Sequence, residues 1–174
     1  MPVTKVDVQS FEIKKTGIKS KQALSTLTGI FLDRGYDIKF TNLDAGVMTT
    51  EYKKFASSGS APPFYYYMQI RARVKIKRGE SIINLSPMVK EQNRSNAAAY
   101  TEHELSYYTG DPQNIRLISS MRETVGWRIL AQIQFMNIVS DTADQFGIAE
   151  EDVIQNVTKH LQMHLVLNHQ CSPI

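Results

Sequence analysis

The feature that most constrains this 174-residue chain is the run from Phe64 to Lys77, in which apolar and polar side chains alternate. One face of the run carries Phe64, Tyr66, Met68, Ile70, Ala72, Val74 and Ile76, and the other carries Tyr65, Tyr67, Gln69, Arg71, Arg73, Lys75 and Lys77. A period of two is typical of a β-strand that buries one face. At about 3.3 Å per residue the run spans roughly 46 Å, so it predicts the long central strand of an antiparallel sheet.

The N-terminal segments predict a strand followed by a helix. Residues 6–14 show a strand pattern, and the apolar residues of 21–34 fall on one stripe at helical spacing. Ser20 is the expected N-cap of this helix, because its hydroxyl can accept a hydrogen bond from a free amide of the first turn. Gly35 stands where a left-handed C-terminal cap is expected.

Further strands are expected on both sides of the central run. The patterns indicate a hairpin of 36–40 and 47–52 with a turn at 42–46, a loop at 57–63, a strand at 81–85 and a loop at 93–99. Residues 100–108 are expected either to form one more strand or to lie irregularly across the sheet. Pro87 predicts either the end of the strand that starts at residue 81 or a bulge near an edge.

The C-terminal third predicts two helices. Asp111 and Pro112 form a helix start, and apolar residues at helical spacing continue to about Phe146. A second helix is expected from Ala149 to His169, since acidic residues at its start suit the positive end of the helix dipole.

These elements predict a single α+β domain over residues 1–174 in the order β-α-β-β-β-β-α-α. Its antiparallel sheet of four to six strands would be packed by one N-terminal helix and a long C-terminal helix pair, with 111–174 as a helical extension packed on the domain. At this length and 42% hydrophobic content, the chain can bury a core without disulfides or metal.

Composition excludes few functions. The net charge of +3 is too small to indicate nucleic-acid binding unless the cations cluster on one face. Cys171 is the only cysteine, so no disulfide framework or CxxC pair exists. The first ten residues lack an apolar signal core, which fits either a cytoplasmic protein or an exported one whose signal has been removed.

The polar face of the central strand is the main candidate binding site. It combines Tyr65, Tyr67, Gln69, Arg71, Arg73 and Lys75. Aromatic rings beside cations are what single-stranded nucleic acid binds, with bases on the rings and phosphates on the basic groups. The alternative is a solvated sheet face, on which cross-strand carboxylates such as Glu51 or Glu80 pair with the cations.

Other candidate sites lack the partners that chemistry needs. His160 and His164 lie four residues apart, the helical spacing for two metal ligands, but no third ligand is placed by the sequence. In a strand His103 would face away from Glu102 and Glu104, so no acid/base cluster forms. Trp127 and the helix methionines are expected to pack in the core. We therefore expect no catalytic residue, no metal, no cofactor and no enzymatic activity.

A family resemblance is carried by the predicted helix and the hairpin that follows it. The segments are Ala23-Leu24 through Gly35-Tyr36-Asp37-Ile38 and then Asp44-Ala45-Gly46-Val47-Met48-Thr49-Thr50-Glu51-Tyr52. Over residues 20–76 the chain resembles the helix-grip domains of BamC-type outer-membrane assembly lipoproteins of the Gram-negative envelope. It departs from them in the long C-terminal helices and in lacking a lipidated cysteine at its start.

The resemblance implies a non-enzymatic, lipoprotein-like envelope domain that acts through protein contacts as a structural or assembly component. Its partners would be other envelope proteins or a second copy of itself, with a lipid anchor outside this chain as the only membrane attachment. The expected location is the periplasm, associated with the outer membrane; the alternative is the cytoplasm. Two alternative functions are a single-stranded nucleic-acid-binding module and a small-molecule carrier with a cleft between the sheet and the long helix.

Overall fold

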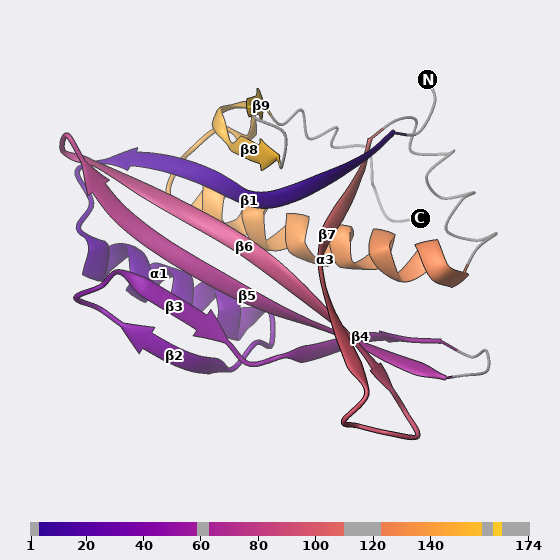
Figure 1. Ribbon diagram of the computed structural model, residues 1–174. Helices are drawn as coiled ribbons and strands as arrows, with labels where there is room; N and C mark the ends of the chain where they lie inside the picture. Colours follow the sequence, from indigo (N-terminus) through magenta and orange to yellow (C-terminus); the bar gives the residue numbers. More distant parts are fainter. Residues whose placement is uncertain (1–3, 59–62, 110–122, 158–161, 165–174) are drawn as a thin grey trace.

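The computed structural model describes residues 4–58, 63–109, 123–157 and 162–164, which form one twisted antiparallel sheet with two helices on the same side of it (Figure 1). In chain order the elements are β1 (Thr4–Thr16), α1 (Ser20–Asp33), β2 (Ile38–Asn42), β3 (Val47–Thr50), β4 (Lys53–Ser57), β5 (Phe64–Lys77), β6 (Glu80–Asn93), β7 (Tyr100–Thr109), α3 (Glu123–Gln145), the 3-10 helix η1 (Glu150–Asp152), β8 (Ile154–Val157) and β9 (Gln162–His164). The predicted α+β class is confirmed; the described residues have one N-terminal helix, α1, and one long C-terminal helix, α3, where a C-terminal pair was predicted.

The central strand is β5, which pairs along its whole length with β6, from Phe64 opposite Asn93 to Lys77 opposite Glu80. Arg78 and Gly79 join the two strands, and both have positive φ angles, 53° and 78°. Two such residues are what a tight hairpin turn needs to match the twist of its strands. The predicted alternation departs from the observed burial at Gln69, which is 4% exposed, and at Ile76, which is 55% exposed.

Each long strand changes its outer neighbour halfway along. β5 pairs with β4 from Tyr65 to Met68 and with β3 around Ala72, while β6 pairs with β1 up to Leu85 and with β7 from Met88 onward. The prediction that the strand ends or bulges at Pro87 is therefore wrong. Pro87 lies between the β1 and β7 pairings, so its missing N–H costs no ladder hydrogen bond on that side.

The core lies between the sheet and the two helices. Phe11 of β1 packs on Phe135 of α3 with ring centroids 5.3 Å apart, and Tyr66 of β5 stacks on Trp127 of α3 at 4.9 Å. The core residues of α1 are those that the helical stripe predicts: Ala23, Leu24, Leu27, Ile30 and Phe31.

The ends of α1 agree with the sequence at one terminus only. Ser20 is not the N-cap; that position is Lys19, which makes no side-chain capping bond, so the hydroxyl of Ser20 already lies inside the first turn. Gly35 does adopt a left-handed conformation, with φ of 76°, and the backbone N–H of Tyr36 donates to the carbonyl oxygen of Phe31. This arrangement satisfies the free carbonyls of the last turn, as expected for a glycine cap.

The C-terminal region departs most from the prediction. The expected helix start at Asp111 and Pro112 lies outside the described residues, and α3 is described from Glu123. The expected helix over 149–169 is wrong for its described parts, which form η1, β8 and β9. β8 pairs with β1, with Ile154 opposite Glu12, because β1 offers a free strand edge that satisfies its backbone. With β4, β8 and β9 the sheet of the described residues has nine strands, more than the four to six predicted.

Candidate functional site: the outer face of the sheet

The side of the sheet away from α1 and α3 is called the outer face here. It is formed by Val47 and Thr49 of β3, by Tyr65, Tyr67, Gln69, Arg71, Arg73, Lys75 and Lys77 of β5, and by Asn84, Ser86, Met88 and Lys90 of β6, as the strand register and the alternating burial require. All six residues predicted as a binding site therefore lie on one face. The structure divides them into a basic half and an aromatic half.

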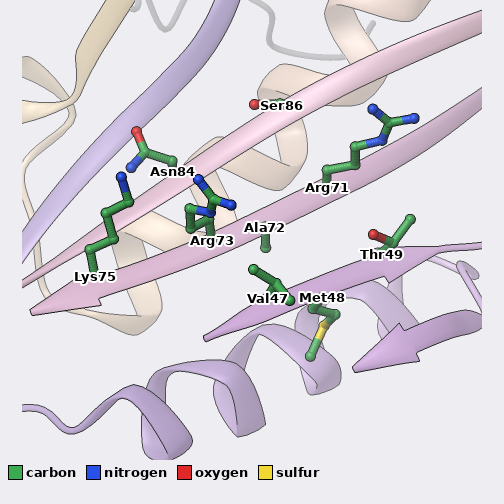
Figure 2. A pocket seen from close by; sticks show the side chains of 9 residues that line it. All are labelled: Val47, Met48, Thr49, Arg71, Ala72, Arg73, Lys75, Asn84 and Ser86. Carbon is green, nitrogen blue, oxygen red and sulfur yellow. The ribbon is translucent and has the colours of Figure 1, made fainter. Parts of the chain in front are cut away.

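The basic half is a shallow depression of about 520 Å³, called the basic groove (Figure 2). Its lining comprises Val47, Met48, Thr49, Arg71, Ala72, Arg73, Lys75, Asn84 and Ser86. Arg73 lies between Val47 on one neighbouring strand and Asn84 on the other, and Arg71 likewise between Thr49 and Ser86. In Figure 2 the ends of Arg73, Lys75 and Asn84 gather at one end of the groove, and Arg71 lies apart from them.

The cations of the basic groove have no carboxylate partner within the described part of the chain. Neither Glu51 nor Glu80 forms an ion pair with Arg71, Arg73 or Lys75, which removes the pairing expected of a merely solvated face. All three side chains are exposed, so their positive charge faces solvent.

Gln69 links the two halves of the outer face. Although it was predicted on an open surface, it is only 4% exposed, since its Nε2 donates to the carbonyl oxygen of Thr50 at 2.9 Å. Its Oε1 accepts a hydrogen bond from Nε of Arg71 at 3.3 Å. Gln69 therefore orients Arg71 and is not itself available as a binding residue.

The aromatic half contains four tyrosines, Tyr52, Tyr65, Tyr67 and Tyr100, called the tyrosine cluster. Lys90 of β6 places its ammonium 4.6 Å from the ring centroid of Tyr52, 4.8 Å from that of Tyr67 and 5.8 Å from that of Tyr100. Such distances are those of cation–π contacts. The lysine therefore occupies the centre of the cluster.

Tyr65, at the far end of the cluster, is also covered by the protein's own cations. Nζ of Lys54 lies 4.0 Å from its ring centroid, and the guanidinium carbon of Arg94 lies 4.8 Å away. The rings of Tyr65 and Tyr67, which were predicted to be open for base stacking, are therefore already in contact with cations of the protein. Sequence reasoning missed Tyr52, Lys54, Lys90 and Arg94, because only the cross-strand register brings them to these rings.

Burial and a carboxylate fix the protonation of Tyr52. Its phenolic O–H donates to Oε1 of Glu102 on β7 at 2.6 Å. Desolvation first, and then the hydrogen bond to the Glu102 carboxylate, raise the pKa of the Tyr52 phenol well above its ordinary value. The Tyr52 phenol therefore keeps its proton to a higher pH than an exposed tyrosine does.

His103 takes no part in the outer face. As predicted, it lies on the opposite side of β7 from Glu102; it is paired with Val89 and its ring centroid lies 5.6 Å from that of Trp127. His164 belongs to β9, while His160 lies outside the described residues. Within the described ranges, no three His, Cys, Asp or Glu side chains gather as metal ligands.

A second exposed surface lies on α3. Leu130 and Ile133 are 46% and 51% exposed, so two apolar side chains one helical turn apart face solvent. Trp127, which could have contributed to a contact surface on this helix, is instead in the core. No described helix has the length and apolar character needed to cross a lipid bilayer.

Comparisons with known proteins find similarity among solved structures. No protein-family model matches the chain, and no curated protein matches it. Among solved structures, the chain is similar to a DUF4468 family protein from Bacteroides ovatus, with 20% sequence identity and a TM-score of 0.40 over 84% of this chain and 86% of the other.

Proposed function

We propose that this chain is a non-enzymatic binding domain that acts through protein contacts at the outer face of its sheet. One observation carries the proposal: Arg71, Arg73 and Lys75 are exposed in a groove, and none has a carboxylate partner within the described residues. A row of cations left uncompensated on a rigid strand is suited to a partner that supplies the opposite charge.

The α3 surface supports the same class of function. Leu130 and Ile133 add exposed apolar area on the helix side of the molecule, away from the basic groove. Apolar side chains that are exposed together favour contact with another protein. The domain would then have two separate contact surfaces, as a structural or assembly component needs.

We further propose that the domain works in the cell envelope, in the periplasm and associated with the outer membrane through a lipid anchor. The resemblance of residues 20–76 to envelope lipoprotein domains supports this location. The upstream coding sequence and cell fractionation test it. A signal peptide ending in a lipobox cysteine agrees with the proposal, and recovery of the native protein in the cytoplasmic fraction contradicts it.

The protein-contact proposal is tested by cross-linking in the native organism, followed by isolation of the tagged chain. Wild type is compared with Arg71→Glu/Arg73→Glu on the outer face, Leu130→Gln/Ile133→Gln on α3, and Lys19→Glu/Lys21→Glu as a charge-matched control on the helix side. We expect a cross-linked partner that the wild type and the control retain and the arginine variant loses. A partner set that is identical for all four proteins contradicts the proposal.

Single-stranded nucleic acid is the second candidate, favoured by the same unpaired cations. If Arg71 and Arg73 contact phosphates, the change Arg71→Ala/Arg73→Ala flattens the salt dependence of binding by about two units. Anisotropy titrations of labelled oligonucleotides at two salt concentrations measure this slope. The rings covered by Lys54, Lys90 and Arg94 make this candidate less favoured than protein contact.

A small-molecule carrier is the least favoured proposal. It needs a cleft between the sheet and the long helix, where Phe11 packs on Phe135 and Tyr66 stacks on Trp127. A thermal shift with a ligand library tests it.

A further inference from the structure

We propose that the basic groove binds an extended acidic segment of a partner protein, one with carboxylates at alternating positions. This inference rests on the proposed protein-contact function and specifies the chemistry of the partner. Three observations carry it: the spacing of the cations, the polar lining of the groove, and the occupied state of the neighbouring tyrosine rings.

The spacing of the cations matches that of an extended peptide. Arg71, Arg73 and Lys75 occupy alternate positions of β5 and point to the same face. Successive side chains on one face of a strand are roughly 6.6 Å apart, because each residue rises about 3.3 Å. An extended peptide with Asp or Glu at every second position repeats its carboxylates at the same interval. Three ion pairs can therefore form in register once the side-chain ends of Arg73 and Lys75, which gather at one end of the groove, turn apart to this interval.

The polar groups beside the cations suit carboxylates and peptide groups. Thr49, Asn84 and Ser86 line the groove next to the two arginines and bring hydroxyl and amide groups from the neighbouring strands. An arginine can bind a carboxylate through two parallel N–H donors, and Gln69 already orients Arg71 for such a contact. The groove thus offers directed donors in addition to its net charge.

The tyrosine cluster argues against a nucleic-acid strand as the occupant. Single-stranded nucleic acid needs free aromatic faces for its bases beside the cations that bind its phosphates. Lys54 and Arg94 lie against Tyr65, and Lys90 lies against Tyr67. Base stacking would have to displace these cations, whereas a carboxylate-bearing peptide needs only the basic groove.

An acidic group on the same face limits the width of the site. Glu12 of β1 lies opposite Asn84 and is 3.6 Å from Nζ of Lys14. It marks the border of the groove on the β1 side, where an acidic peptide would be repelled. The peptide therefore has to run along β5, over Arg71, Arg73 and Lys75, and cannot cross the sheet towards β1.

Fluorescence anisotropy with three labelled probes tests the proposal. The probes are a peptide of alternating Glu and Thr, a peptide of the same composition with its Glu residues in one block, and oligothymidine of equal charge. Each is titrated with wild type, with Arg71→Gln/Arg73→Gln and with the control Lys19→Gln/Lys21→Gln, after thermal melts of all three proteins. We expect the alternating peptide to bind wild type about tenfold more tightly than the block peptide, and the arginine variant to lose about tenfold in affinity while the control does not.

Each other outcome overturns the inference. Equal binding of the two peptides means that only net charge is recognised, and tighter binding of oligothymidine favours a nucleic acid. If no acidic peptide binds but the cross-linked partner is still lost from the Arg71/Arg73 variant, the protein-contact function stands. The proposal that the partner contributes an acidic segment is then wrong. If the partner also persists in that variant, both proposals are wrong.

Discussion

Tyr52 and Glu102 are joined by a hydrogen bond of 2.6 Å, although β5 and β6 separate their segments in the sheet. Tyr52 lies between β3 and β4, the two strands that pair with one edge of β5. Glu102 lies on β7, which pairs with the edge of β6 that faces away from β5. The ammonium of Lys90 on β6 lies 4.6 Å from the centroid of the Tyr52 ring. The hydrogen bond therefore connects the segments on either side of the two central strands, across the outer face, and keeps the tyrosine cluster in place.

Replacing Tyr52 by Phe removes this bond and keeps the ring over Lys90. We expect the free energy of unfolding to fall by about 1 kcal/mol, since the bond is made to a charged group that is itself exposed. Urea denaturation measures the change. Tyr100→Phe is the matched control, because the Tyr100 side chain is 58% exposed and should change stability little. Equal losses in both variants would contradict the role given to Tyr52.

Replacing Tyr36 by Phe should act in the opposite direction. The Tyr36 side chain is 1% exposed, and its hydroxyl has no hydrogen-bond partner within the described residues. Removing a buried polar group that lacks a partner removes its desolvation cost from the folded state. We therefore expect the free energy of unfolding to rise by up to about 1 kcal/mol. The same urea titration checks this, and a clear loss of stability would show that the hydroxyl has a partner.

Stability should decrease at alkaline pH. Burial raises the pKa of the Tyr36 and Tyr52 phenols in the folded state above the ordinary value of about 10 that applies on unfolding. A raised folded-state pKa means that the stabilisation is complete below about pH 10 and is lost as the pH rises through the folded value. Urea midpoints measured across this range should fall, with a smaller fall in Tyr36→Phe. Full ionisation of all eight tyrosines by the folded protein near the ordinary pKa would refute this.

Gly46 should tolerate no side chain. Its φ angle is 68°, and a Cβ there would lie 2.3 Å from the backbone oxygen of Val74, whose N–H also donates to the Gly46 carbonyl at 2.7 Å. We expect Gly46→Ala to cost about 2–4 kcal/mol through combined strain and collision.

Gly79→Ala is the control for this change. Gly79 has a similar φ angle of 78°, but a Cβ there meets nothing within 4 Å, so only the backbone strain of about 1 kcal/mol remains. Thermal and urea unfolding of the two variants separate collision from strain. Equal losses would mean that the approach of Gly46 to Val74 is not important for stability.

The sequence predicted those elements whose apolar pattern fits only one type of secondary structure. The alternation of 64–77 and the apolar stripe of 21–34 each fit a single period, and both elements form as expected. The helix prediction for the segment after residue 149 failed because its apolar residues fit short strands as well as a helix. The free edge of β1 decides in favour of strands. The prediction at Pro87 failed for a related reason. β6 changes its partner strand from β1 to β7 at this residue, and that change depends on pairings between distant segments.

The candidate site was predictable along one strand and not across strands. The strand pattern placed Arg71, Arg73 and Lys75 on one face, where the structure has them. It could not place Asn84 beside Arg73, or Lys90 above Tyr67, because those contacts depend on the register of β5 and β6. Gln69 was misjudged for the same reason, since its hydrogen bond to Thr50 comes from another strand.

The pairing of β1 has a consequence for synthesis on the ribosome. β1 leaves the ribosome before every other described element, yet its strand partners β6, β7 and β8 all begin at Glu80 or later. The nascent chain must therefore carry Thr4–Thr16 with an unpaired backbone until the β5–β6 hairpin has been made. Pairings so distant in sequence are slow to form and leave strand edges open to aggregation. Binding of a chaperone to this first strand would protect the chain during that interval.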